Sequence, residues 1–269
     1  MEMETLETIR LTTPAHAGWS AGPAEELTRA SLHQLFTNQI PFIRLRNFAS
    51  VAECEQLVKQ AGRYGFSPYR GVEPQINKIG ITVFEYNRLS QERYFSDAAA
   101  ATTQLQDIFD NSFDPIERLM GQIQHAGMHA IVARRGNGQP YYAGLVRRIE
   151  NGTLLHIDFA PAEQQEWEVA GITHQLAWNL YLRTSEDQGK THIYNRQWTP
   201  QDDVFRDGTY GYDPQVAAGC QQISFQPRPG ELVIFNTRNF HYVDPTPDER
   251  VTVTSAIGRI SDDETVFWS

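Results

Sequence analysis

The stretch TLLHIDFAP, residues 153–161, places a histidine and an aspartate two positions apart in an otherwise apolar run. Burying either side chain costs free energy unless a partner compensates for it. The surrounding residues are typical of a β-strand, in which positions i and i+2 point to the same face. We therefore predict that His156 and Asp158 direct an imidazole and a carboxylate into one cavity.

Two side chains cannot complete a metal site, and His241 is the best candidate for the third ligand. It follows a turn at 229–230 and a predicted strand over 232–235. Two histidines and one carboxylate leave adjacent positions on the ion open, an arrangement that non-haem Fe(II) uses when a co-substrate and O2 both bind. Zinc would more often take a fourth protein ligand. His192 is the alternative third ligand, but no arginine follows it at the spacing found after His241.

Arg250 comes nine residues after His241 and begins the run RVTVTSAIGRI, residues 250–260. On a strand, Arg250 and Thr252 face the same side. A buried guanidinium needs an anion, and a carboxylate accepts two parallel hydrogen bonds from it. The spacing therefore predicts a carboxylate-bearing co-substrate that lies across the metal.

The pattern of apolar and polar residues along the chain changes near residue 129. Before this point helices are predicted over 22–38, 50–65 and 102–124, with Pro115 breaking the last, and one strand is predicted within 40–48. After it, β-branched and aromatic runs alternate with Gly, Pro, Asn and Asp, which favours a double-layered antiparallel barrel or sandwich braced by helices. Strands are predicted there over residues 129–135, 143–149, 153–159, 174–183, 191–195, 222–226, 231–236 and 250–260.

We find no internal repeat and no linker, so we predict a single domain over residues 1–269. Within it, a helical lead-in and lid would occupy about 1–128, and the β core about 129–260. Segments 66–95 and 198–219 are weak in periodicity, and we expect them to fold over the mouth of the barrel as functional loops do. Ordinary surface loops are the alternative for both.

Charge and composition restrict the partners. The net charge of -10 and the pI near 5.3 argue against binding to nucleic acid or to an anionic membrane surface. No stretch is apolar enough for a membrane span, and residues 1–20 lack the apolar core of a secretory signal. The two cysteines, far apart, indicate no disulfide framework and a reducing, cytoplasmic setting. We expect a small-molecule partner, and either a monomer or a homodimer fits.

These motifs together resemble the Fe(II)- and 2-oxoglutarate-dependent oxygenases, whose core is a double-stranded β-helix of the jelly-roll, cupin-like type. The resemblance spans roughly residues 145–260. Two segments, VRRIENGTLLHIDF (146–159) and QLAWNLYLRTSEDQGKTHIYNRQWTP (175–200), are similar to a narrower branch. That branch contains the stand-alone aliphatic halogenases and their hydroxylase relatives, which act on alkaloids and free amino acids.

The resemblance implies that His156, Asp158 and His241 hold Fe(II), which chelates 2-oxoglutarate and then binds O2. It also implies that Arg250, with Thr252, binds the distal carboxylate of 2-oxoglutarate. The expected reaction hydroxylates an unactivated C–H bond of a small molecule, such as a free amino acid or a natural-product intermediate, and releases succinate and CO2. The halogenases carry a small residue at the position of Asp158, which opens a site for chloride, so the carboxylate here indicates hydroxylation.

Three other functions stay open. One is desaturation or cyclisation by the same kind of iron centre, and another is demethylation or hydroxylation of a protein or nucleic acid. The third is a non-enzymatic β-barrel that holds a metal structurally. Arg250 argues against the third, because a structural metal site has no use for that cation.

Further side chains are candidates for contacts with the bound molecules. We assign Trp178 to the co-substrate, with Tyr181 as a further aromatic candidate. Packing inside the barrel is the competing interpretation of these aromatic residues. The candidates for the substrate are Arg147, Tyr194, Asn195 and Trp198.

Overall fold

The computed structural model describes residues 18–87 and 89–269. The prediction that residues 1–20 hold no secretory signal therefore falls almost entirely outside the described residues. Within these ranges, no helix combines the length and the apolar character needed to cross a bilayer. Cys54 is a buried free thiol and Cys220 a partly exposed one.

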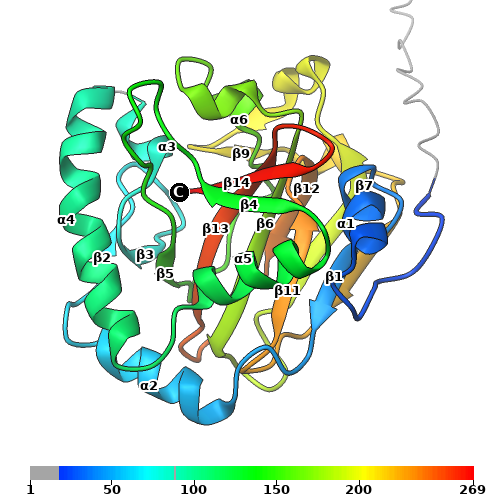
Figure 1. Cartoon of the computed structure of the whole chain (residues 1–269). Helices are drawn as coiled ribbons and strands as arrows, with labels where there is room; N and C mark the ends of the chain where they lie inside the picture. The colour runs from blue at the N-terminus through cyan, green and yellow to red at the C-terminus, as the bar shows by residue number, and fades with distance from the viewer. Residues whose placement is uncertain (1–17, 88) are drawn as a thin grey trace, which may run out of the picture.

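Two β-sheets form a double-stranded β-helix (Figure 1). The larger sheet runs in the order β1 (Phe42–Leu45), β11 (Leu232–Asn236), β6 (His174–Arg183), β13 (Val251–Arg259), β5 (Leu145–Arg148), β3 (Asn77–Ile79) and β2 (Ser67–Pro68). At its side, β14 (Glu264–Trp268) pairs with β13 and, in parallel, with β4 (His129–Val132). The smaller sheet has the order β10 (Gln222–Phe225), β7 (Thr191–Gln197) and β12 (Asn239–Val243). A separate pair joins β8 (Arg206–Asp207) to β9 (Gly211–Tyr212).

Helices cover one face of the larger sheet (Figure 1). They are α1 (Arg29–Phe36), α2 (Val51–Ala61), α4 (Gln91–Asp110) and α5 (Pro115–His125). The predicted break at Pro115 is confirmed, because this proline is the first residue of α5 and Asp114 caps the helix. The short elements are α3 (Val83–Tyr86), α6 (Ala160–Glu163), η1 (Glu168–Gly171), η2 (Pro200–Phe205) and η3 (Pro214–Ala217).

Alternation along β6 divides its residues between the core and an internal cavity. The side chains that pack against the helices in the main hydrophobic core are Leu176, Trp178, Leu180 and Leu182. The side chains that line the cavity on the other face are Gln175, Ala177, Asn179 and Tyr181. Between the two sheets, Tyr181 packs with Ile193 of β7 and Phe225 of β10. The larger sheet is therefore apolar toward the helices and polar toward the cavity.

The predicted strands after residue 129 are all present except the one over 153–159, which the structure corrects. This segment is extended, but it joins no ladder, and only His156 forms an isolated antiparallel bridge with His241. Its other peptide groups bond in different directions. Leu154 N donates to the hydroxyl of Tyr210, whereas Leu155 O accepts from the main-chain N of Tyr212. A regular ladder with β12 cannot form where successive peptide groups bond to different partners.

The β core also extends beyond the predicted range of 129–260. The larger sheet includes β1, β2 and β3 from the lead-in and β14 from the end of the chain. In addition, His241 lies within β12 and not just beyond the strand before it. The chain passes from β11 in the larger sheet to β12 in the smaller sheet through Thr237 and Arg238, which carries His241 across the barrel.

Gly152 allows the 153–159 segment to approach β12 closely. Its φ is +70°, and a Cβ atom there would lie 2.5 Å from the carbonyl oxygen of Val243. We expect Gly152→Ala to lower the free energy of unfolding by about 1–3 kcal/mol, because the added carbon meets main-chain atoms in a left-handed conformation. Urea denaturation measures the change. The control is Gly136→Ala, where a Cβ meets nothing within 4 Å; equal losses in both variants would contradict the argument.

Candidate metal centre

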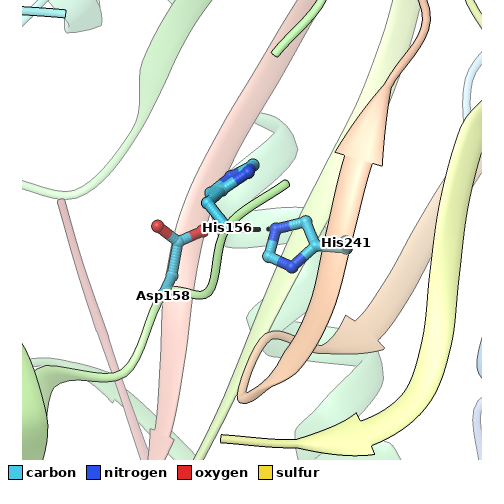
Figure 2. A group of neighbouring side chains, drawn as sticks. All are labelled: His156, Asp158 and His241. Atoms are coloured by element: carbon cyan, nitrogen blue, oxygen red, sulfur yellow. Dashed lines mark ion pairs between the residues drawn. The ribbon is translucent and has the colours of Figure 1, made fainter. Parts of the chain in front are cut away.

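The structure brings His156, Asp158 and His241 together (Figure 2). One ligand atom from each residue lies within 4.8 Å of the others. The Nε2 atom of His241 is 3.6 Å from Oδ2 of Asp158, and the two imidazole rings are 4.2 Å apart between centroids. Paired main-chain hydrogen bonds of 2.9 Å between His156 and His241 set this distance. The three side chains are therefore placed to share one ion.

Main-chain carbonyls orient both imidazoles. The Nδ1 atom of His156 lies 2.8 Å from the carbonyl oxygen of Leu154, and that of His241 lies 2.9 Å from the carbonyl oxygen of Asn239. A carbonyl oxygen can only accept, so each Nδ1 carries the proton and donates it. Each Nε2 then presents a lone pair to the cavity, which is the usual arrangement of a metal-binding histidine.

The protonation states also suit a cation. Burial, and then the neighbouring His241, lower the pKa of His156 to about 4, so its imidazole is neutral near pH 7. Burial by itself would raise the pKa of Asp158, but the closeness of the two imidazoles, and then the charge of Arg147, outweigh it and hold that pKa well below its usual value. A neutral imidazole and an ionised carboxylate are the forms that bind metal.

Arg250 is 3% exposed and lines the same cavity. Its Nη2 atom donates to Thr191 Oγ1 at 3.3 Å, and its guanidinium carbon lies 5.2 Å from the centre of the Tyr181 ring. Within the described part of the chain, its Nε and Nη1 atoms have no hydrogen-bond partner and no carboxylate neutralises it. Burial, and then the charge of Arg147, lower the pKa of Arg250.

Thr252 lies in a row of polar side chains across three strands. On β13 it is directly opposite Arg147 of β5 on one side and Tyr181 of β6 on the other. In the part of the chain that the structure covers, the buried Thr252 Oγ1 and Tyr181 hydroxyl both lack a hydrogen-bond partner. Buried polar atoms seldom stay unsatisfied, so this end of the cavity fits an anion with several acceptor oxygens.

The cavity has a volume of about 190 Å³ and joins the candidate metal ligands to Arg250. It includes residues from both segments that the sequence assigns to a lid. The first segment supplies Tyr69, Val72, Ile76, Thr82, Val83 and Phe84, and the second supplies Tyr210. The ring of Tyr210 stands edge-on to His156, with centroids 5.4 Å apart.

Arg147 is the predicted substrate residue that the structure places in the cavity. Its Nη2 atom donates to Asn179 Oδ1 at 2.7 Å, while its Nε has no partner among residues 18–87 and 89–269. The adjacent Arg148 points away and lies over the ring of Phe66, 4.9 Å from its centre. One arginine of the pair therefore faces the cavity and the other does not, as alternation on a strand predicts.

Four other predicted contacts need correction. Trp178 belongs to the core under the helices, where its Nε1 donates to Ser255 Oγ at 2.7 Å, because its strand position faces away from the cavity. Tyr194 and Trp198 pack in a separate apolar cluster of the smaller sheet. Asn195 accepts a hydrogen bond from Asn38. None of these four residues is among those that line the cavity in the described structure.

His192, the alternative third ligand, lies elsewhere. Its Nε2 atom is 2.8 Å from Asp244 Oδ2, and its ring stacks on Tyr242 with centroids 4.3 Å apart. On β7 it stands opposite Tyr242 of β12, one position away from His241. One position along a strand reverses the face, so His192 points away from the centre that His241 joins.

Several residues that line the cavity were not predicted from the sequence. The position of Asn179 could have been predicted, since it is a polar residue in an apolar strand and its side chain points to the face opposite that of Trp178. Tyr210, Glu163 and Gln164 come from irregular segments, where no period predicts the direction of a side chain. Their placement depends on how the loops fold back over the sheets.

Comparisons with known proteins give the family. The sequence profile described as "Carrier-protein-independent halogenase WelO5" matches residues 24–269. "Leucinostatins biosynthesis cluster protein S" of Purpureocillium lilacinum is 35% identical over 198 residues, which are 70% of this chain and 81% of that protein. The "L-gamma-glutamyl-L-propargylglycine hydroxylase" of Streptantibioticus cattleyicolor is 28% identical over 269 residues, 96% of this chain and 99% of that protein.

Solved structures agree on the fold. The structure of an N-substituted L-amino acid dioxygenase from Burkholderia ambifaria has a TM-score of 0.63 at 15% identity, and the match covers 90% of this chain and 91% of that chain. The same enzyme in complex with α-ketoglutarate also gives a TM-score of 0.63. The buried, unpartnered atoms of Arg250, Thr252 and Tyr181 and the converging ligand atoms fit iron and 2-oxoglutarate. The chain therefore belongs to the WelO5 family of iron- and 2-oxoglutarate-dependent oxygenases.

Proposed function

We propose that this chain hydroxylates an unactivated C–H bond of a small molecule and releases succinate and CO2. The observation that supports it most is the two-histidine, one-carboxylate group in the same cavity as a buried arginine that lacks an anion among the described residues. His156, Asp158 and His241 would hold Fe(II). Bound iron, 2-oxoglutarate and O2 supply the oxidising power, which no side chain of the protein could provide.

The residues around the metal position and shield the reactants. Arg250 would donate to the distal carboxylate of 2-oxoglutarate, helped by the hydroxyl groups of Thr252 and Tyr181. The carbonyls of Leu154 and Asn239 keep each imidazole in the tautomer that binds metal. Apolar side chains of segment 66–95 cover the cavity and limit the access of water to the reacting C–H bond.

Asp158 favours hydroxylation over chlorination. The family is described by a halogenase, and a halogenase needs a ligand position on the metal for chloride. In this chain the carboxylate of Asp158, 3.6 Å from His241, would fill that position. An ionised carboxylate that belongs to the protein would outcompete a free halide there.

The substrate is proposed to be an amino acid or a derivative of one. Support comes from the names of two similar proteins, the L-gamma-glutamyl-L-propargylglycine hydroxylase and the N-substituted L-amino acid dioxygenase. Arg147 offers a second cation in the cavity for a substrate carboxylate. We further infer a cytoplasmic setting, in keeping with two cysteines that are both free.

Replacement of His241 tests the metal site. We expect His241→Ala to weaken Fe(II) binding by more than the roughly 10- to 100-fold that loss of a residue supporting a ligand causes, because a direct ligand is removed. The measurement is an anaerobic Fe(II) titration. His192→Ala is the matched control and should bind iron like the unaltered protein. If His192→Ala lost iron and His241→Ala kept it, the proposed ligand set would be wrong.

Replacement of Arg250 tests the co-substrate site. Addition of 2-oxoglutarate to the anaerobic Fe(II) protein should produce the weak visible charge-transfer band of the chelate. We expect Arg250→Ala to raise the 2-oxoglutarate concentration at half-saturation by about 100-fold or more, since a buried charge pair would lose one partner. Arg183→Ala removes an exposed arginine from the end of β6 and should leave the titration unchanged. An unaltered titration in Arg250→Ala would contradict the assignment.

Replacement of Asp158 tests the choice of reaction. In Asp158→Gly, we expect chloride to shift the visible band of the Fe(II)–2-oxoglutarate complex, because a ligand position becomes open. The unaltered protein should show no shift. Sodium nitrate at the same ionic strength controls for general salt effects. A chloride-dependent shift of equal size in both proteins would mean that the carboxylate does not fill that position.

A further inference from the structure

A second carboxyl group, that of Glu163, lines the cavity. It ends α6, five residues after Asp158, and its side chain is 16% exposed. It does not belong to the group of atoms that converges on the metal position within the described chain. Glu163 is therefore not a fourth ligand, and the roles given above to the cavity residues do not account for it.

The carboxyl group of Glu163 has only weak hydrogen-bonding and charged partners in the protein. One oxygen accepts a hydrogen bond of 3.3 Å from the main-chain N of Phe159. The other lies 3.8 Å from Nη1 of Arg206, whose side chain is 40% exposed. Burial, and then the charge of Asp158, raise the pKa of Glu163 to about 8. A buried carboxylate without a close cation is costly, so a cation that enters the cavity would bind favourably here.

The next residue adds a second acceptor. Gln164 also lines the cavity, and its Oε1 atom is buried with no hydrogen-bond partner in the described ranges. Two consecutive residues thus present acceptor oxygens to the same space. A protonated amine has only donors, up to three of them, and no acceptor that these oxygens would repel. A carboxylate or a phosphate would have no hydrogen to donate to Gln164, and its negative charge would oppose the ionisation of Glu163.

The cavity already separates opposite charges. Arg147 lies on β5 of the larger sheet, and Glu163 lies on the segment that follows the candidate metal ligands. In the proposed function Arg250 binds the co-substrate, so Arg147 is the cation that remains for the substrate. Together, Arg147 and Glu163 match a molecule that carries one negative and one positive group.

We propose that Glu163 and Gln164 bind the protonated amine of the substrate, whose carboxylate meets Arg147, so that the substrate class is zwitterionic molecules of the amino acid type. This inference rests on the proposed function and defines the substrate of the same site. The amine would neutralise Glu163 and satisfy Gln164, and it would hold the substrate by its polar end with its carbon chain beside the metal.

Paired probes test the inference. The probes are free L-amino acids and γ-glutamyl amino acids, each compared with the analogue in which hydrogen replaces the amino group. Binding is followed anaerobically by the change that each probe causes in the visible band of the Fe(II)–2-oxoglutarate protein. We expect at least one amine to bind about tenfold or more tightly than its analogue, since a charge-assisted hydrogen bond distinguishes them. In Glu163→Gln that preference should disappear.

Glu166→Gln is the matched control. Glu166 is an exposed carboxylate three residues further along and does not line the cavity, so the preference for the amine should persist in this variant. Three results would overturn the inference: binding of no amine, equal binding of both members of every pair, or a preference that survives in Glu163→Gln. Each of these requires that the visible band forms. If the band itself does not form, the proposed function fails instead.

Discussion

The active cavity depends on one pair of main-chain hydrogen bonds, those that join His156 to His241. The 153–159 segment belongs to no ladder. This pair and the bond of Thr153 to Val243 tie it to β12, and the bond of Asp158 to Thr237 ties it to the turn before that strand. The same contact brings two imidazoles from distant parts of the sequence within 4.2 Å of each other. Backbone pairing thus fixes the separation of the rings before any metal binds, which is the preorganisation that a metal centre requires.

The architecture could be predicted from the sequence wherever apolar residues recur at the regular spacing of a helix or a strand. The strand over 174–183 was predicted with its observed bounds, and the helix predicted over 50–65 contains α2, which Ser50 caps. The convergence of His156, Asp158 and His241 could be predicted because a histidine and an aspartate are rare in an apolar run. The face of Trp178 was misjudged, since an aromatic residue on a half-buried strand suits either side. Loop residues such as Glu163 could not be placed, because tertiary packing alone decides their direction.

Membership of this family does not by itself determine which reaction the protein catalyses. The profile that matches the chain is described by a halogenase, yet the chain carries a carboxylate, that of Asp158, 3.6 Å from His241, and the proposed function excludes a halide on that ground. The fold, the imidazole pair and the arginine can serve either reaction, because they only hold and orient the reactants. A single side chain can therefore change the product while the rest of the site is preserved.

Tyr210 connects the 198–219 insertion to the candidate metal ligand His156. It comes from the irregular 198–219 insertion, accepts a hydrogen bond from Leu154 N and packs against the His156 ring. An insertion of this kind is where a new substrate preference would be expected to evolve. Here any change in its path also moves a support of His156, the proposed iron ligand, so selection for a new substrate would be constrained by the need to retain the metal.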